Sequence, residues 1–382
     1  METKFKQIES TASEPFGSAS SLPFFSYSDN DVHAAERAEI FHKDWVFVCA
    51  ENEIGNSGDY FAFTLAGEPV VVVRGKDNHL RALSNVCRHR GTLLNENGFG
   101  NSKRFVCPYH AWTYDSEGTL VGVPHPGNVE INKTEHCLPQ FLISIWHGLV
   151  FVSLNQNVVP LSEKLAGIEP YLKRFRSERF TNAFSGKEEE WASNWKLAME
   201  NAMESYHLFK VHSNTLEATT PTKSAFYVEG GADWTITGGK IVGSRSKLWD
   251  WFVPSDSKLF ENYLLISIPP SFVGVFTYDS WDWISVLPKN VEECWVRSAG
   301  LYESRPPEDK RTTEFVEAFF AEDKEICERV QTGMHAIHSQ GGKLVELERI
   351  VVDFHRFYAS HMFNTTPPEV YQSPESGTIL GI

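Results

Sequence analysis

Residues 45–155 contain a series of short apolar runs in which β-branched and aromatic side chains are frequent. Gly- and Asn-containing turns separate these runs, which is the pattern of short antiparallel strands joined by hairpins. The expected strands cover residues 60–65, 69–73, 80–86, 103–106, 111–114, 119–121, 141–146 and 149–154. This stretch therefore predicts a compact all-β domain.

The rest of the chain predicts a mixture of helices and strands. Residues 1–22 indicate a loose polar arm, and residues 29–45 place apolar side chains on one helical face. Beyond the β domain, the expected helices are 161–177, 194–212, 312–333 and 343–361, and the expected strands are 234–237, 240–244, 263–268, 272–278, 283–287 and 294–301. Strands followed by helices favour an antiparallel sheet with helices on one face. We predict an α+β chain with an arm and helix (1–44), a β domain (45–157) and a larger second domain (158–382).

Composition narrows the range of partners. The 382 residues hold 35 Lys and Arg against 50 Asp and Glu, a net charge of −15 at pH 7. Nucleic acid and anionic membrane surfaces both require a basic face, so neither is expected as a partner. No apolar run approaches the roughly 18 residues of a membrane span, and the polar start lacks the apolar core of a signal peptide. Six Cys are too few for a disulfide scaffold. We expect a soluble cytoplasmic protein, and without a GxGxxG or P-loop motif we expect no bound dinucleotide or nucleoside triphosphate.

Two short runs in the β domain carry metal-ligand chemistry. Cys87 and His89 stand in the first run, and Cys107 and His110 stand in the second. Two thiolates and two imidazoles suit either a structural zinc ion or a Rieske [2Fe–2S] cluster. Zinc fingers place the two Cys together, whereas here each run supplies one Cys and one His. That arrangement favours the cluster, in which the Cys bind one iron and the His bind the other. The other four Cys have no ligand-spaced partner and are interpreted as buried apolar residues.

A second candidate site lies in the second domain. His207 and His212 are five residues apart, so on a regular helix they would point about 140° away from each other. They converge only if the helix bulges or ends between them. Two His and one carboxylate form the facial triad that holds Fe(II) with open positions. The alternative is that both are ordinary core or surface histidines.

The third ligand is expected from the helix that follows Glu314. Asp323 falls within its apolar stripe, while Glu322 and Glu325 lie towards the edges. A buried carboxylate needs a cation or strong hydrogen-bond donors, and iron is a natural candidate. Asp353 and Asp309 are competing choices of ligand. The non-metal alternative is that Asp323 accepts a hydrogen bond from a neighbouring helix or from Arg329.

The runs at 85–91 and 107–112 resemble those of the Rieske non-haem iron oxygenases, in the alpha or terminal oxygenase subunit. The extra cluster-loop Cys of the respiratory Rieske proteins is lacking. The resemblance implies an N-terminal all-β Rieske domain and a helix-grip-like catalytic domain. It implies a [2Fe–2S] cluster on Cys87, His89, Cys107 and His110, and a mononuclear Fe(II) on His207, His212 and Asp323.

The same resemblance assigns roles to Glu204 and Asn201. In this family a carboxylate three residues before the first iron His accepts a hydrogen bond from a cluster His of the neighbouring protomer. Glu204 occupies that position and His110 would be its partner. Most members have Asp there, and oxygenases of quaternary ammonium compounds are among those with Glu. Asn201, one turn earlier, is expected to position the iron ligands. The alternative for Glu204 is a solvated helix residue.

The function implied is that of a terminal oxygenase, a monooxygenase or dioxygenase that uses O₂ and electrons from a separate NAD(P)H-dependent reductase or ferredoxin. A head-to-tail homotrimer would bring the cluster of one protomer to the iron of the next. The Trp pairs 249/251 and 281/283 suit either pocket walls or core packing. The expected substrate is a small quaternary ammonium compound, hydroxylated or N-demethylated. Hydroxylation of an aromatic compound is the alternative, and an electron-transfer Rieske protein without oxygenase activity is the alternative of a different class.

One basic group completes the picture. Arg88, Arg90, Lys103 and Arg104 lie close to the cluster ligands in an otherwise acidic chain. They are suited to steering an acidic ferredoxin, and equally to hydrogen-bonding the anionic cluster.

Overall fold

The computed structural model describes residues 2–175, 177–242, 261–303, 310–366 and 369–374, and the side chains of 174 and 310–313 are not described. The chain divides into two compact units. The smaller unit is Phe41–Leu161, and the larger unit joins Met1–Ile40 to Ser162–Ile382. The first forty residues thus pack with the second half of the chain.

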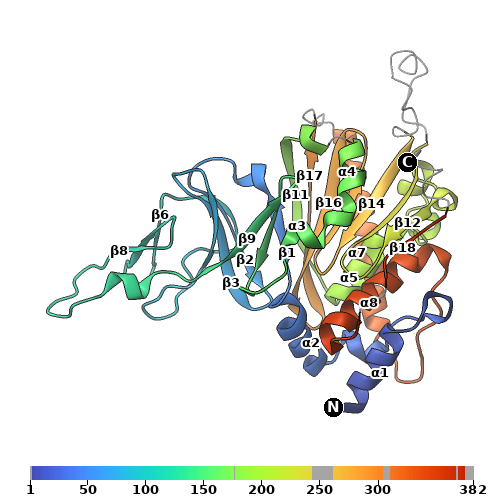
Figure 1. Cartoon of the computed structure of the whole chain (residues 1–382), viewed down its shortest axis with the longest axis horizontal. Coiled ribbons are helices and arrows are strands. Elements are labelled where there is room, and N and C mark those ends of the chain that lie inside the picture. Colours follow the sequence, from blue (N-terminus) through green and yellow to red (C-terminus); the bar gives the residue numbers. More distant parts are fainter. Residues whose placement is uncertain (1, 176, 243–260, 304–309, 367–368, 375–382) are drawn as a thin grey trace. The chain divides into compact units, whose positions relative to one another are not determined.

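The smaller unit is built from two antiparallel sheets (Figure 1). A seven-stranded sheet has the order β1-β10-β9-β4-β3-β2-β5, and a three-stranded sheet has the order β6-β7-β8. The strands are β1 (Val46–Ala50), β2 (Asp59–Leu65), β3 (Glu68–Arg74), β4 (Leu80–Ser84), β5 (Gly98–Asn101), β6 (Arg104–Val106), β7 (Thr113–Asp115), β8 (Leu120–Gly122), β9 (Gln140–Trp146) and β10 (Leu149–Ser153). A single apolar core runs from Val71 and Leu83 in the large sheet to Phe105 and Tyr114 in the small one. Cys87 and Cys107 belong to this core, so its packing brings the two Cys runs together.

The larger unit holds one eight-stranded antiparallel sheet in the order β11-β17-β16-β15-β14-β13-β12-β18. Its strands are β11 (Asn182–Trp191), β12 (Phe226–Gly230), β13 (Thr235–Lys240), β14 (Asn262–Ile268), β15 (Phe272–Phe276), β16 (Ser280–Asn290), β17 (Glu293–Tyr302) and β18 (Tyr371–Gln372). Its α-helices are α1 (Glu2–Ala12), α2 (Asn30–Glu36), α3 (Leu161–Lys164, at the unit boundary), α4 (Glu169–Phe175), α5 (Trp195–Met203), α6 (Leu208–Val211), α7 (Lys310–Gly333) and α8 (Arg349–Phe363). Helix α5 packs against β14 to β17, α8 against β12 and β13, and α7 against β11 (Figure 1).

A buried ion pair anchors helix α5. Lys196 is fully buried, and its Nζ lies 2.5 Å from Oε1 of Glu36 in α2. Trp195 Nε1 and Tyr358 Oη donate to the same carboxylate at 2.8 and 2.9 Å. Burial alone would raise the pKa of Glu36, but Lys196, His33 and Trp195 lower it. Because buried charges need such partners, these contacts hold α5, α2 and α8 in one arrangement.

The expectation of a loose N-terminal arm is wrong. Helix α1 buries Ile8 and Ala12, and the ring of Phe5 lies 6.3 Å from that of Phe363 in α8. Residues further along this segment join the chain near residue 343 through backbone hydrogen bonds, from the N–H of Ser21 to Gly342 and from the N–H of Leu344 to Ala19. The polar composition of the arm conceals these few apolar anchors.

The predicted α+β class is confirmed, and most expected strands are present with shifts of up to three residues at their ends. Of the strand expected over 240–244, only Lys240 lies in a strand among the described residues. The helix expected over 161–177 is divided into α3 and α4, and the helix expected over 343–361 begins only at Arg349.

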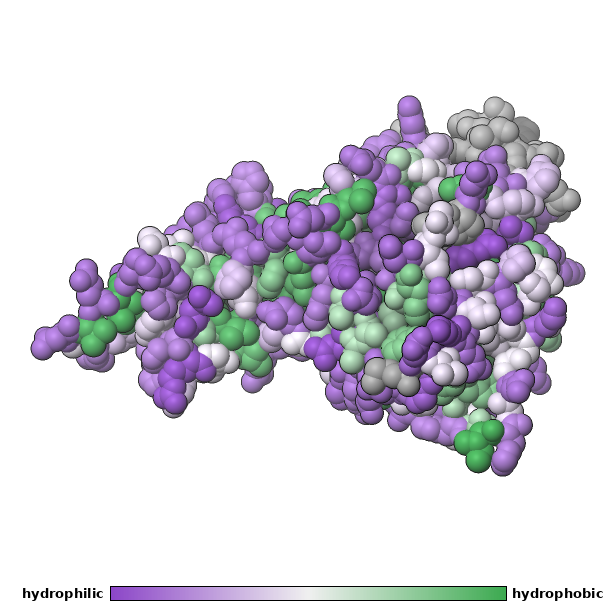
Figure 2. Space-filling model, turned by 60° about the horizontal axis from the view of Figure 1, so that its bottom comes forward, coloured by the Kyte–Doolittle hydropathy of each residue, from purple (hydrophilic) through white to green (hydrophobic). Residues whose placement is uncertain are grey.

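Strand β11 was not predicted, because its exposed sequence NAFSGKEEEW lacks apolar alternation. It lies at the edge of the sheet and pairs only with β17. Among the described residues, no helix combines the length and the apolar character of a membrane span. Hydrophilic residues cover most of the face drawn in Figure 2, and the hydrophobic ones form smaller separate groups.

Candidate metal centres

Two loops of the smaller unit repeat one hydrogen-bond pattern. In the first loop the N–H of Cys87 donates to Thr92 O at 2.8 Å, and the N–H of Gly91 donates to Cys87 O at 3.0 Å. In the second loop the N–H of Cys107 donates to Trp112 O at 2.8 Å, and the N–H of Ala111 donates to Cys107 O at 3.0 Å. The residue four positions after each Cys has positive φ, +77° at Gly91 and +54° at Ala111. Each run is thus a tight loop that begins at its Cys.

The two loops bring the candidate ligands together, with the Cys at their buried starts and the His further along each loop. Cys87 and Cys107 are 2% and 3% exposed, and the rings of His89 and His110 lie 4.7 Å apart. Burial alone would raise the pKa of the Cys107 thiol, but the backbone N–H groups of Tyr109 and His110 lower it. Backbone N–H groups directed at a sulfur stabilise a thiolate, which is the form that binds a metal.

The surroundings of His110 also fit the binding of a Rieske cluster. Nδ1 of His110 is buried and finds no hydrogen-bond partner among the described residues. A nitrogen of this kind suits a metal ligand, because a buried polar atom without a partner is otherwise costly. Burial, together with the nearby His89 and Arg90, lowers the pKa of His110, so its ring is neutral near pH 7. The hydroxyl of Tyr114, a residue with no signal of its own in the sequence, lies 3.4 Å from Cys87 Sγ.

The surface around these loops is basic and partly apolar. Arg88, Arg90, Lys103 and Arg104 are all exposed. Arg90 lies over the ring of Tyr109 at 5.2 Å, and Tyr109 is itself 55% exposed. These cations were expected either to steer an acidic ferredoxin or to hydrogen-bond the cluster. Their exposure favours the first role.

In the larger unit, the helix predicted over 194–212 is interrupted. Helix α5 ends at Met203, Glu204 is extended (φ −113°, ψ 160°), and the single turn α6 follows. His207 and His212 stand at the two ends of α6, with ring centroids 5.0 Å apart. The prediction of one continuous helix is therefore wrong. The break lies before His207 rather than between the two His, which converge from the N-cap and C-cap of the single turn α6.

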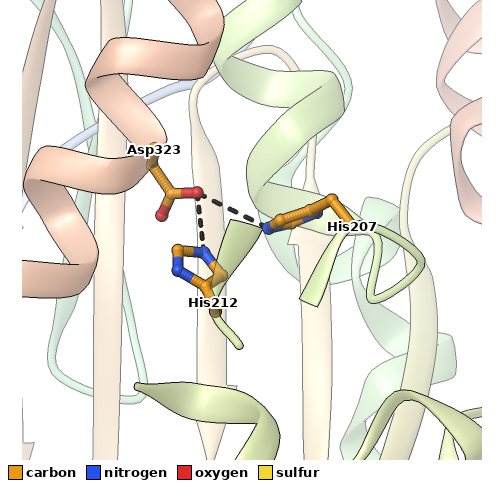
Figure 3. A group of neighbouring side chains, drawn as sticks. All are labelled: His207, His212 and Asp323. Carbon is orange, nitrogen blue, oxygen red and sulfur yellow. Dashed lines mark hydrogen bonds and ion pairs between the residues drawn. The ribbon is translucent and has the colours of Figure 1, made fainter. Parts of the chain in front are cut away.

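Asp323 of helix α7 faces both rings (Figure 3). Its Oδ1 lies 2.9 Å from Nε2 of His212 and 3.5 Å from Nε2 of His207. The three side chains form a possible metal site whose ligand atoms all lie within 4.8 Å of one another. Metal–ligand bonds of about 2 Å at right angles place neighbouring ligand atoms about 3 Å apart. The observed spacings fit one ion between the three residues.

Each His also contacts a carboxylate through its other ring nitrogen. Nδ1 of His207 lies 2.5 Å from Oε1 of Glu204, and Nδ1 of His212 lies 2.7 Å from Oε2 of Glu322. The carboxyl of Glu204 also accepts from the backbone N–H of Tyr206 and His207. Sequence reasoning had assigned Glu322 only to the edge of the apolar stripe. Its one signal in the sequence is its position next to Asp323.

The charges in this group favour a bound cation. Burial alone would lower the pKa of His207, but Asp323 and Glu204 raise it to about 10. Burial would raise the pKa of Asp323, and the two His lower it to about 2. The carboxylates that favour protons on the rings also favour a divalent metal, since metal and protons compete for the same nitrogens.

The other acidic candidates lie elsewhere. Oδ2 of Asp353 accepts from Tyr227 Oη at 2.6 Å and from Thr235 Oγ1 at 2.9 Å. Asp309 lies outside the described residues. Arg329 is exposed and lies 3.9 Å from Glu325. Instead Asp323 accepts from Nδ2 of Asn201 at 2.8 Å, the residue expected to position the ligands.

A cavity of about 440 Å³ opens beside His207, within the larger unit. Its polar lining includes Tyr27, Glu200, Glu204, Glu348 and His355. Glu204 is thus accessible from this cavity on one side and contacts His207 on the other. It is not a solvated helix residue, since α5 ends before it.

The aromatic pairs do not identify a substrate pocket. Trp249 and Trp251 lie outside the described residues. Trp281 and Trp283 are 1% and 3% exposed, and the ring of Trp281 packs 5.7 Å from Phe272 and 4.9 Å from Phe276. Core packing is the role that these contacts support.

Two domain families match the chain. The Rieske [2Fe-2S] domain matches residues 44–141, and the ring hydroxylating alpha subunit (catalytic domain) matches residues 178–364. The first match contains all four cluster-ligand candidates, and the second contains His207, His212 and Asp323.

Named relatives fall into two groups. The anthranilate 1,2-dioxygenase large subunit of Acinetobacter baylyi is 30% identical over 262 residues, covering 66% of this chain and 56% of that protein. The glycine betaine monooxygenase oxygenase subunit of Pseudomonas aeruginosa is 33% identical over 197 residues, covering 52% of this chain and 46% of that protein. The chain spans about half the length of these curated relatives.

Solved structures with the same fold cover nearly the whole chain. The quaternary ammonium Rieske monooxygenase CntA superposes with a TM-score of 0.80 at 22% identity, covering 93% of this chain and 98% of that one. Naphthalene 1,2-dioxygenase from Rhodococcus sp. superposes with a TM-score of 0.77 at 21% identity, covering 96% and 98%. At these identities the likeness concerns the fold. The two domain matches show that this chain belongs to the Rieske non-haem iron oxygenases, with a Rieske [2Fe–2S] domain followed by the catalytic domain of a ring hydroxylating alpha subunit.

Proposed function

We propose that this chain is the terminal oxygenase of a multicomponent Rieske system and oxidises a small quaternary ammonium compound with O₂. The observation that carries the proposal is the convergence of His207, His212 and Asp323 in the chain that also carries the two cluster loops. An electron-transfer Rieske protein has no use for a second metal site of this kind.

The residues divide the work as follows. Cys87, His89, Cys107 and His110 hold the [2Fe–2S] cluster, and His207, His212 and Asp323 hold Fe(II). Bound iron supplies open positions for O₂ and substrate, and the cluster supplies one electron at a time. Two neutral imidazoles and one carboxylate leave the Fe(II) site a net positive charge. Asn201 keeps Asp323 in place through its 2.8 Å hydrogen bond.

In this proposal the cluster of a neighbouring protomer would supply electrons to the iron site. Glu204 contacts His207 and lines an open cavity, so its carboxylate is available to His110 of a second copy. This supports a head-to-tail homotrimer in which Glu204 links the two metal centres. The exposed basic residues Arg88, Arg90, Lys103 and Arg104 complement an acidic ferredoxin or a separate NAD(P)H-dependent reductase.

Two observations support the quaternary ammonium substrate. Position 204, which bridges two protomers in this proposal, holds Glu, and oxygenases of quaternary ammonium compounds are similar in having Glu there. One relative at 33% identity is a glycine betaine monooxygenase oxygenase subunit. Oxidation at an N-methyl group would release formaldehyde.

Hydroxylation of an aromatic compound is the second candidate. It is favoured by the similarity to an anthranilate 1,2-dioxygenase large subunit, which extends over the longer alignment of 262 residues. The two candidates differ in their products, so one experiment separates them.

The test is a substrate screen with purified protein, a generic reductase and NADH. Glycine betaine and related methylammonium compounds are scored for formaldehyde, and anthranilate and benzoate are scored for ring hydroxylation. Formaldehyde that is formed only with methylammonium compounds supports the proposal, and ring products alone favour the second candidate. His207→Ala is the control for both products. Activity that persists in this variant, or a loaded sample with no iron beyond the two of the cluster, would overturn the oxygenase assignment.

A further inference from the structure

The two iron-site histidines are oriented by carboxylates from different parts of the chain. Glu204 stands three residues before His207, so that contact is local. Glu322 lies on α7, 110 residues from His212 in sequence. The two adjacent acids of α7 therefore face the same ring, with Asp323 at Nε2 and Glu322 at Nδ1.

The Glu322 side chain has a second contact that fixes its position. Oγ1 of Thr215 donates to Oε2 of Glu322 at 2.7 Å, the same oxygen that lies 2.7 Å from Nδ1 of His212. The backbone N–H of Thr215 also donates to His212 O at 3.0 Å. His212 is 1% exposed in its side chain, whereas Glu322 is 30% exposed. The buried ring of His212 thus contacts the partly exposed carboxylate of Glu322, which Thr215 holds in place.

This geometry selects one form of the imidazole. A neutral His carries its proton on one nitrogen and offers the lone pair of the other. An acceptor at Nδ1 places the N–H there and leaves the Nε2 lone pair directed at Asp323, where a metal would bind. Without that acceptor the ring is free to rotate or to adopt the other tautomer.

We propose that Glu322, held by Thr215, is a positioning residue that orients His212 for iron. The inference rests on the proposed function, since it takes His212 as an iron ligand. It adds Glu322 to the iron site as the residue that orients His212. This role follows only from the contacts of α7 with His212 and Thr215.

The test measures Fe(II) affinity of the mononuclear site by competition with a chelator in the full chain with its cluster loaded. Glu322→Ala should weaken iron binding about 10- to 100-fold, the range found when partners of metal-bound His are removed. Glu322→Gln keeps an acceptor oxygen and should recover part of the loss, and Thr215→Val should give a smaller loss than Glu322→Ala. Glu325→Gln is the matched control, because Glu325 is 75% exposed on the same helix.

Melting temperatures of the iron-free variants separate positioning from folding. Equal iron-free melting temperatures with weaker iron binding in Glu322→Ala support the proposal. Wild-type iron affinity in Glu322→Ala, or the same loss in Glu325→Gln, overturns it and leaves the oxygenase assignment intact. If His207→Ala binds iron as tightly as the wild type, the proposed function itself fails.

Discussion

Nδ2 of Asn201 donates a hydrogen bond to Oδ1 of Asp323 at 2.8 Å, and this is the same oxygen that faces both His rings. The last turns of α5 and the middle of α7 are therefore joined at the candidate iron site. An amide donor stabilises the charged carboxylate without competing for the metal.

Replacing Asn201 with Ala should weaken Fe(II) binding about tenfold, since Asp323 loses a partner that orients it. Cluster content should stay at the wild-type level, because the cluster loops belong to the other unit. Iron titration after chelation, with absorbance of the cluster measured on the same samples, checks both. The exposed Asn97→Ala variant is the control, and equal iron affinity in the two variants would contradict the role of Asn201.

Tyr114→Phe should lower the reduction potential of the cluster. The Tyr114 hydroxyl lies 3.4 Å from Cys87 Sγ, and a hydrogen bond to sulfur stabilises the more negative, reduced cluster. Loss of about 1 kcal/mol corresponds to roughly 40 mV for a one-electron couple. A redox titration followed by absorbance or EPR measures the shift. An unchanged or higher potential would show that the hydroxyl does not donate to the thiolate.

Glu204→Gln should separate electron transfer from metal binding. The variant keeps a side chain of the same size at His207, so iron and cluster contents should change little. Turnover should fall about 100-fold or more, because the proposed charged link between His207 and the cluster of the next protomer would be lost. Pre-reduced protein mixed with O₂ and substrate reports the rate at which the cluster is oxidised. The exposed Glu346→Gln variant should behave as wild type. A Glu204→Gln cluster that oxidises at the wild-type rate would exclude the bridging role.

Asp353 should make stability depend on pH. Burial raises the pKa of Asp353 from 3.8 to about 6, although Tyr227 and Thr235 partly oppose the shift. Between these values the folded protein keeps a proton that the unfolded chain has released, so the folded state loses stability as pH rises through about 6. Asp353→Asn keeps an acceptor for Tyr227 and Thr235 and does not titrate.

Between about pH 5 and pH 8 the wild type should therefore lose roughly 1–2 kcal/mol relative to Asp353→Asn. Thermal melting of both proteins across this range measures the difference. Parallel curves for the two proteins would show that Asp353 titrates normally.

Much of this protein follows from local sequence. The β runs of residues 45–155 and the apolar stripe of α7 predict elements that the structure contains. Burial of one face spaces the apolar residues periodically along the chain, and this period can be recognised without the tertiary structure. The spacing of Cys87, His89, Cys107 and His110 indicates two equivalent loops, and the backbone hydrogen bonds of the two loops match.

Other features depend on contacts between distant segments. The edge strand β11 and helix α1 have weak patterns of their own, and each is stabilised by a partner far along the chain. The interruption of α5 before His207 is not encoded by Pro or Gly, since residues 194–212 contain neither. It accompanies the contacts of Glu204 with the turn that follows.

The sequence by itself determined the ligand types, their order and the class of chemistry, since thiolate, imidazole and carboxylate select their metals wherever they meet. Only the tertiary structure decided which acid joins the His pair and which acid lies behind His212. Asp323, Asp353 and Glu322 are equally acidic in the sequence, and only the packing of α7 and α8 sets their distances to the two rings. The physical reason is that Coulomb and coordination energies depend on separations of a few ångströms, which side chains more than a hundred residues apart acquire only when the chain folds.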